Sequence, residues 1–163
     1  MITAPDAARL NVYEIGMADV ERVIAIDSTH SGRSRRHFFE KRFAAAAARP
    51  DDYVHIGAMR GGAMGGFAIV RILRGEFGHD RAVAVLDAIG VAAESQERGI
   101  GQALMEELDK IMRRKRVGSL QTQADWTNHD LLRFFNAAGF KLAPRLVLQR
   151  PANEPLFDTS EEV

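Results

Sequence analysis

The chain of 163 residues contains no cysteine. That absence excludes disulfide bonds, thiolate metal sites, iron–sulfur clusters and a cysteine nucleophile. The chain also has no excess of one charge, since lysine plus arginine and aspartate plus glutamate each count 22. Proteins that bind nucleic acid through its phosphates rely on surplus positive charge. We therefore expect no nucleic-acid partner.

Long hydrophobic runs are missing as well. No apolar stretch approaches the roughly 18 residues of a membrane span, and residues 1–6 lack the basic and apolar regions of a signal peptide. Hydrophobic residues make up 46% and charged residues 27%, as in an ordinary globular domain. We expect no membrane partner and a cytoplasmic, soluble domain over residues 1–150, followed by a flexible acidic tail at 151–163.

Apolar periodicity and glycine or proline breaks divide the chain into helices and strands. The alternation predicts strands at 11–15, 53–59, 65–73, 82–91, 119–124, 140–142 and 146–150. The 3.6-residue period predicts helices at 17–27, between Ser34 and Pro50, at 99–116 and at 128–138. This order mixes hairpins with crossovers, so the predicted class is α/β or α+β with a mixed sheet.

The most informative segment joins the nearly all-apolar strand at 82–91 to the helix at 99–116. Gly99 and Gly101 open that helix. The first N–H groups of a helix lack internal partners and carry the positive end of its dipole. Glycines there would let a phosphate rest on the backbone, and Arg98 would add a charged donor. The same glycines would also suit a helix that packs closely on its strand, and the spacing alone does not decide between the two.

Gln96-x-x-Gly99-x-Gly101 after a strand ending in Val91 resembles the acetyl-CoA motif of the GNAT superfamily of N-acetyltransferases. About 30 residues later, Asn128-x(6)-Phe135-x(3)-Gly-Phe resembles that family's later helix and strand. The element order matches too, so the resemblance spans roughly residues 11–150. It implies a central mixed sheet flanked by helices, with acetyl-CoA as the co-substrate and no metal.

The resemblance also implies which residues hold the co-substrate. It places the pantetheine arm between splayed strands, bonded to the backbone of Ile89 and Val91 and to Asn128. The backbone amides implied for the pyrophosphate are those of Gln96, Glu97, Arg98, Gly99, Ile100 and Gly101. The family often has a tyrosine at the place of Phe135, where it protonates the departing thiolate. Phe135 cannot do so, and the role is vacant or filled elsewhere. We expect the Phe135 ring to line the co-substrate site instead, sealing the base of the pantetheine cleft together with Phe134 and Phe140.

Two carboxylates are candidates for the base that deprotonates an attacking amine. Asp87 lies within the apolar strand, where a carboxylate is costly unless it is paired or functional. It is either the general base, acting directly or through water, or a structural partner of an arginine. Glu94 lies in the loop after the strand and is the weaker candidate, since loop carboxylates are mostly solvated.

Candidates for substrate binding come from two places. His30 and Arg33 begin a basic segment that extends to Arg42, which either attracts an acidic substrate or is a solvated helix face. Trp126 precedes the last helix and either walls the substrate pocket or is a buried anchor. The histidines lack the spacing of metal ligands.

The resemblance therefore predicts an N-acetyltransferase that moves the acetyl group of acetyl-CoA to a primary amine of a small molecule or protein. Without cysteine there is no cysteine-linked acyl-enzyme, which favours direct attack in a ternary complex. The rival hypothesis is a non-catalytic acyl-CoA-binding sensor or scaffold. Dimers through a sheet edge occur among similar proteins, so a homodimer is also open.

Overall fold

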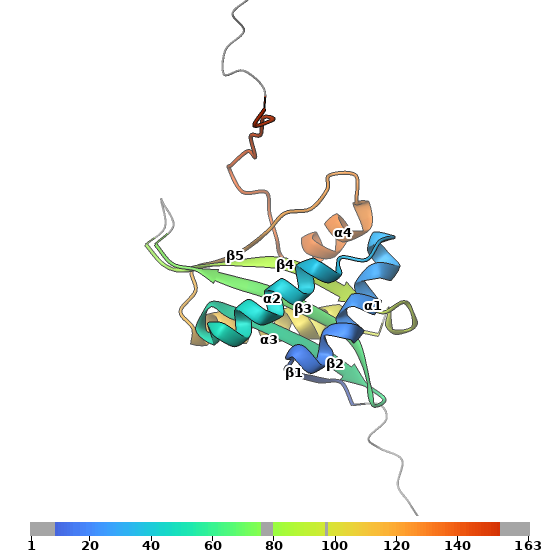
Figure 1. Ribbon diagram of the computed structural model, residues 1–163. Coiled ribbons are helices and arrows are strands. Elements are labelled where there is room, and N and C mark those ends of the chain that lie inside the picture. The colour runs from blue at the N-terminus through green and yellow to red at the C-terminus, as the bar shows by residue number, and fades with distance from the viewer. Residues whose placement is uncertain (1–8, 76–79, 97, 154–163) are drawn as a thin grey trace, which may run out of the picture.

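A computed structural model describes residues 9–75, 80–96 and 98–153 of the chain. Its five strands form one sheet in the order β1-β2-β3-β4-β5 (Figure 1). Neighbouring strands are antiparallel except for β4 and β5, which are parallel. The strands are β1 (Asn11–Glu14), β2 (Tyr53–Arg60), β3 (Ala63–Leu73), β4 (Val83–Val91) and β5 (Ser119–Thr122). The sheet is therefore mixed, as the sequence predicts.

Four α-helices cover the two faces of this sheet (Figure 1). They are α1 (Val20–Ser31), α2 (Arg36–Ala48), α3 (Ile100–Arg114) and α4 (His129–Ala137), with short 3-10 turns at Met17–Asp19, Pro50–Asp52 and Ala93–Ser95. Helices α1 and α2 share one core cluster with the sheet, which includes Phe39 and Phe67. Helix α3 fills the opposite core with Leu104 and Leu108, and α4 adds Phe135 to it.

Two helix boundaries differ from the prediction. The sequence predicts that α1 stops before Ser28, but it continues to Ser31. The hydroxyls of Ser28 and Thr29 donate back to the carbonyls one turn earlier, so these polar residues do not break the helix. Gly32 ends it in the left-handed conformation at φ 66°. The N-cap of α2 is Arg35, not Ser34.

The two predicted closing strands are wrong for the described structure. Residues 140–142 and 146–150 form no strand and lie outside the sheet. Leu142 is 100% exposed, and Leu146 and Leu148 are each 88% exposed. Their strand-like pattern finds no partner within this chain, because the backbone leaves the body of the protein after α4 (Figure 1). Most of the predicted tail, 154–163, lies outside the described residues.

None of the described helices is long and apolar enough to cross a membrane.

A buried histidine gives the fold a pH-dependent stability. His55 on β2 packs against the Phe43 ring, and neither of its ring nitrogens has a hydrogen-bond partner. Burial, the largest cause, lowers the pKa of His55 to about 4; Asp87 opposes the shift and Arg42 adds to it. The unfolded chain binds a proton near pH 6.5, so the contribution of His55 is complete above that pH and is lost as pH falls towards 4.

We predict that the free energy of unfolding drops by about 2 kcal/mol between pH 7.5 and pH 5 through His55 alone. His55→Phe keeps the ring packing and removes the titrating group. Between pH 7.5 and pH 5 the unfolding free energy of this variant should therefore fall by about 2 kcal/mol less than that of the unaltered protein. Urea unfolding at several pH values measures both slopes. Parallel slopes for the two proteins would contradict the assignment.

Candidate functional site

A β-bulge divides β4 into two halves. Leu86 pairs with Val70 of β3 and Ala88 pairs with the neighbouring Ile69, so Asp87 is the extra residue. Pairing between β4 and β5 ends at this point, with Leu86 opposite Thr122. The bulge therefore separates the paired half of β4 from a half whose β5-facing edge is open.

Backbone groups of Ile89 and Val91 face that open edge. The N–H of Ala92 donates to Gly65 of β3, which extends the β3–β4 ladder. In an antiparallel ladder alternate residues bond the same neighbour. The even residues from Ala88 to Ala92 thus face β3, and Ile89 and Val91 face away from it. The sequence-based assignment put the pantetheine arm on these two residues.

The start of α3 comes shortly after the open half of β4 in the chain. Gly99 is the N-cap of α3 at φ 76°, a left-handed conformation that favours glycine, although a Cβ there would meet nothing within 4 Å. The N–H of Ala103 bonds to the carbonyl of Gly99. The N–H groups of Ile100, Gly101 and Gln102 consequently have no acceptor within the helix. They form the positive end of a 15-residue helix beside the open half of β4.

Two arginines add charge to this end. Arg98 is exposed immediately before the helix. Arg60, at the end of β2, donates through Nη1 to the carbonyl oxygen of Arg98 at 2.9 Å. Sequence reasoning missed Arg60, because only the β2–β3 hairpin brings it to a loop 38 residues away. Gln96 lies in the same loop, and the prediction for Glu97 falls outside the described residues.

Gly101 also has a packing role. A Cβ on Gly101 would meet the ring of Phe134 at 2.8 Å, so the absence of a side chain lets α4 approach α3. Phe134 contacts the Phe135 ring, and Phe135 contacts Phe140, with centroids 5.5 Å and 4.9 Å apart. Phe135 is buried in this aromatic cluster. Close packing of helices therefore explains the glycine at position 101, whereas the left-handed backbone conformation explains the glycine at position 99.

Asp87 is held by two arginines on the α2 side of the sheet. Its carboxylate accepts from Arg71 Nε at 2.6 Å and Nη2 at 2.8 Å, and Arg42 Nε lies 2.9 Å away. Its side chain is only 8% exposed. The hydrogen bond to Asp87 raises the pKa of Arg71. The structure thus matches the alternative in which Asp87 partners an arginine, and the pairing anchors the bulge to β3 and α2.

Glu94 is exposed and is also paired. Arg22 of α1 donates to its carboxylate at 2.9 Å and to the carbonyl of Met64 at 3.0 Å. A backbone hydrogen bond, and then the bond from Arg22, lower the pKa of Glu94. A carboxylate with a lowered pKa is a weaker base, so this geometry favours a role in fixing α1 to the loop.

His30 reaches the open half of β4 from the last turn of α1. Its Nε2 donates to the carbonyl oxygen of Val91 at 2.6 Å, across 61 positions in the sequence. Arg33 lies nearby in the chain, exposed in the loop between α1 and α2. The structure therefore brings His30 to the strand end that was predicted to hold the co-substrate.

The rest of the basic segment is largely neutralised. Arg35 pairs with the buried Asp27, and Arg42 pairs with Asp87. Arg36 pairs with Glu21 and Glu40. These arginines fasten helices together rather than form one free basic surface.

The segment between β5 and α4 holds the remaining predicted residues. Trp126 is 84% exposed, so the buried-anchor alternative is wrong. The turn around it is fixed by Asp125, whose carboxylate accepts from the N–H and hydroxyl of Thr127. Asn128 caps α4 by accepting from the N–H of Leu131 at 3.2 Å. The cap uses its side-chain oxygen, and the amide nitrogen remains the group available for a ligand.

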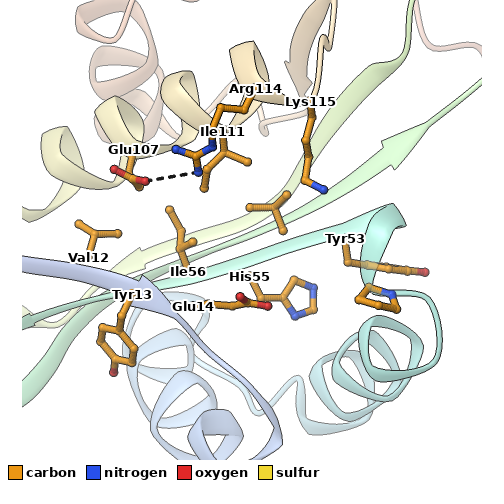
Figure 2. Close-up of a pocket in the computed structure, with 12 residues that line it drawn as sticks. Val12, Tyr13, Glu14, Tyr53, His55, Ile56, Glu107, Ile111, Arg114 and Lys115 are labelled. Carbon is orange, nitrogen blue, oxygen red and sulfur yellow. Dashed lines mark ion pairs between the residues drawn. The ribbon is translucent and has the colours of Figure 1, made fainter.

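A pocket of about 280 Å³ lies elsewhere, between the edge of β2 and the last turns of α3 (Figure 2). Figure 2 shows Arg114 and Lys115 reaching from α3 over this edge, with Glu107 in an ion pair to Arg114. None of the site residues predicted from the sequence lines this pocket. Within the ranges that the structure covers, no group of three or more histidine, aspartate and glutamate side chains could hold a metal ion.

Comparison with known proteins identifies the family of this chain. The model of the acetyltransferase (GNAT) family matches residues 20–140. The chain therefore belongs to the GNAT family of acetyltransferases, and it is an acyltransferase by that membership. No curated protein sequence matches it significantly.

Solved structures share the fold at low sequence identity. A transcriptional regulator from Bacillus halodurans C-125 superimposes with a TM-score of 0.74 at 18% identity, over 88% of this chain and 99% of that one. The aminoglycoside N-acetyltransferase AAC(6')-Iy in complex with CoA gives 0.73 at 16%, over 88% and 95%. A ribosomal-protein-alanine N-acetyltransferase from Brucella melitensis biovar Abortus 2308 gives 0.71 at 16%, over 87% and 99%.

The contact between Gly101 and Phe134 can be tested directly. Gly101→Ala should lower the free energy of unfolding by about 1–2 kcal/mol, because the new methyl group overlaps the Phe134 ring. Phe134→Leu removes the ring atoms at that point. In a protein that carries Phe134→Leu, Gly101→Ala should therefore lower the free energy of unfolding much less. Chemical unfolding of the two single variants and the double variant gives the coupling. Additive effects would show that the two residues do not compete for this space.

Proposed function

We propose that this chain transfers the acetyl group of acetyl-CoA to a primary amine by direct attack in a ternary complex. The observation that carries the proposal is the edge of β4 beyond the bulge, where Ile89 and the N–H of Val91 face away from β3 with no strand beside them, and which leads into the glycine-capped start of α3. Backbone donors there suit an acylated, diphosphate-bearing co-substrate: amides along a strand edge for the pantetheine arm, and a helix N-terminus for the pyrophosphate. Solved relatives of the same fold were determined with CoA or with a CoA bisubstrate analogue.

Acetyl-CoA supplies a thioester whose carbonyl carbon the amine attacks, with the CoA thiol as the leaving group. The protein's part is mainly to position the reactants and to stabilise charge. The N–H of Ile89 points from the open edge and is placed to stabilise developing negative charge on the acetyl oxygen. Removal of one such donor in other enzymes costs about 3–4 kcal/mol of transition-state stabilisation. The amide nitrogen of Asn128 is the proposed donor to the pantetheine arm.

The proposed acceptor side is the mouth formed by His30 and the end of β4. Arg33 and the exposed ring of Trp126 are the other side chains proposed to contact the amine substrate. AAC(6')-Iy is named as acting on aminoglycosides and the Brucella protein on ribosomal protein alanine, so the fold serves small-molecule and protein amines alike. A release assay for free thiol across both classes of amine tests the proposal. Release with none of them, together with tight acetyl-CoA binding, would favour a non-catalytic binding module.

Arg98 provides the sharpest test of the co-substrate site. Arg98→Glu places a negative charge beside the start of α3, and we expect acetyl-CoA affinity to fall by at least about tenfold through repulsion of the pyrophosphate. Lys110→Glu is the matched control, since it makes the same charge change on α3 about 15 Å from the start of the helix. Calorimetry at low ionic strength measures both. An equal loss of acetyl-CoA affinity in both variants would mean that only the net charge of the protein matters. Unchanged affinity in Arg98→Glu would show that the loop before α3 does not bind the co-substrate.

Asp87 was proposed from the sequence as the base, and its two arginine partners now favour a positioning role. In Asp87→Asn the neutral amide no longer compensates Arg71 and Arg42, so we expect an unfolding free energy lower by about 1–3 kcal/mol. Turnover of the folded variant should fall less than about tenfold across pH 6–9, against the 10²–10⁴ that loss of a general base costs. A hundredfold loss in a variant that binds acetyl-CoA normally would restore Asp87 as the base.

A further inference from the structure

An open hollow at the end of α3 is lined mostly by arginines. It has a volume of about 510 Å³, and its lining residues are Arg81, Arg113, Arg116 and Val117. It lies where α3 ends and where β4 and β5 begin, whereas the candidate co-substrate site lies at the start of α3 (Figure 1). The 15 residues of α3 place its two ends roughly 20 Å apart, so the hollow is separate from that site.

The charge that lines this hollow is positive. Of its four lining residues three are cations and none is acidic. Within the part of the chain that the structure covers, none of the three arginines forms an ion pair with a carboxylate. The pocket of Figure 2 differs, because Glu14 and Glu107 line it together with Arg114 and Lys115. An anion in the hollow would therefore meet three guanidinium groups and no lining carboxylate.

The stem of Arg81 is placed by the chain that follows α3. The N–H of Gly118 donates to the carbonyl of Ala82 at 2.8 Å, which ties this chain to the start of β4. A Cβ on Gly118 would meet the Cβ of Arg81 at 3.0 Å and its Cδ at 3.5 Å. The absence of a side chain at Gly118 thus leaves room for Arg81 to lie against the backbone beyond α3, where it lines the hollow with the other two arginines.

Arg116 holds a backbone conformation that is typical of glycine. Just beyond α3 the N–H of Val117 bonds to the carbonyl of Met112. The N–H of Arg116 bonds to the carbonyl of Arg113. These two bonds form a Schellman motif, whose left-handed residue is usually glycine because a Cβ is unfavourable there. Arg116 occupies that place at φ 56°, so the chain accepts a strained backbone to put a guanidinium group at the hollow.

The helix dipole accounts for only part of this cluster. Cations in the last turn of a helix stabilise its negative end, and Arg113 and Arg114 lie in the last turn of α3. Arg81 comes from the segment before β4, and Arg116 lies beyond the helix in a conformation that glycine would adopt more readily. A role at the dipole explains neither of these two residues. What they share with Arg113 is the hollow that all three line.

We propose that this hollow binds a small anion that carries two phosphate groups. Guanidinium groups form paired, charge-assisted hydrogen bonds with phosphate oxygens. An anion with several negative charges can neutralise all three arginines, whereas a single carboxylate would leave two of them unpaired. The proposal does not rest on acetyl transfer, because the hollow and the candidate co-substrate site lie at opposite ends of α3.

Arg116→Gly tests the site with a variant that should fold well. It removes the guanidinium group and supplies the residue that the left-handed backbone favours, so the melting temperature should rise by roughly 2–4 °C. Calorimetry with pyrophosphate as the probe should show an affinity at least about tenfold lower than that of the unaltered protein. Arg81→Ala should lower the pyrophosphate affinity as much, although it changes a separate segment of the chain.

Lys115→Ala is the matched control. It removes one positive charge at the same end of α3, but Lys115 lines the pocket of Figure 2 and not the hollow. At an ionic strength of about 0.15 M its pyrophosphate affinity should stay within about twofold of the unaltered protein. An equal loss in all three variants would show that only the general positive field attracts pyrophosphate, and would overturn the site. Unchanged affinity in Arg116→Gly, or no pyrophosphate binding by the unaltered protein, would overturn it as well.

Discussion

The double ion pair of Asp87 with Arg71 and Arg42 is the interaction on which the rest of the site depends. Asp87 is the extra residue of the bulge, and the two arginines draw it towards β3 and α2. Before the bulge, the even-numbered side chains Ala84 and Leu86 belong to the α3 core. After it, Ala88 belongs to the α1–α2 core, so the alternation of β4 has shifted by one residue.

That shift explains how one strand serves both a core and a site. Up to Leu86 the strand pairs on both sides, which secures the sheet. Beyond Asp87 the pairing with β5 stops, so the backbone of Ile89 faces outward without a strand partner, and the carbonyl of Val91 accepts from His30 instead. A carboxylate buried in an apolar strand is costly when unpaired. The arginines remove that cost and tie the bulge to a neighbouring strand and to a helix.

The sequence predicted the parts of the fold that local pattern controls. The sheet class, the glycine start of α3 and the helix at 128–138 followed from periodicity and turn residues. The sequence could not predict contacts between distant segments. These are the hydrogen bond from Arg60 to the carbonyl of Arg98, the hydrogen bond from His30 to the carbonyl of Val91, and the ion pairs of Asp87 with Arg71 and Arg42. No local signal marks such pairs, since each joins elements that only the folded sheet brings together. The closing strands failed for a related reason, because a strand pattern specifies a preference for pairing but not the partner.

The candidate site consists mainly of backbone groups, and a backbone site depends on the path of the chain more than on particular side chains. Amides along an open strand edge and at a helix start need a particular chain path, with glycine at Gly99 for its positive φ, at Gly101 for the packing of Phe134 and at Gly90 for the packing of Phe67. Solved structures at 16–18% identity share the fold over 95–99% of their own chains. The side chains proposed to contact the amine come from separate elements: His30 from α1 and Trp126 from the loop before α4. Both side chains are exposed, so they can vary without disturbing the bulge, and the proposed acetyl-transfer scaffold can then be fitted to different amines.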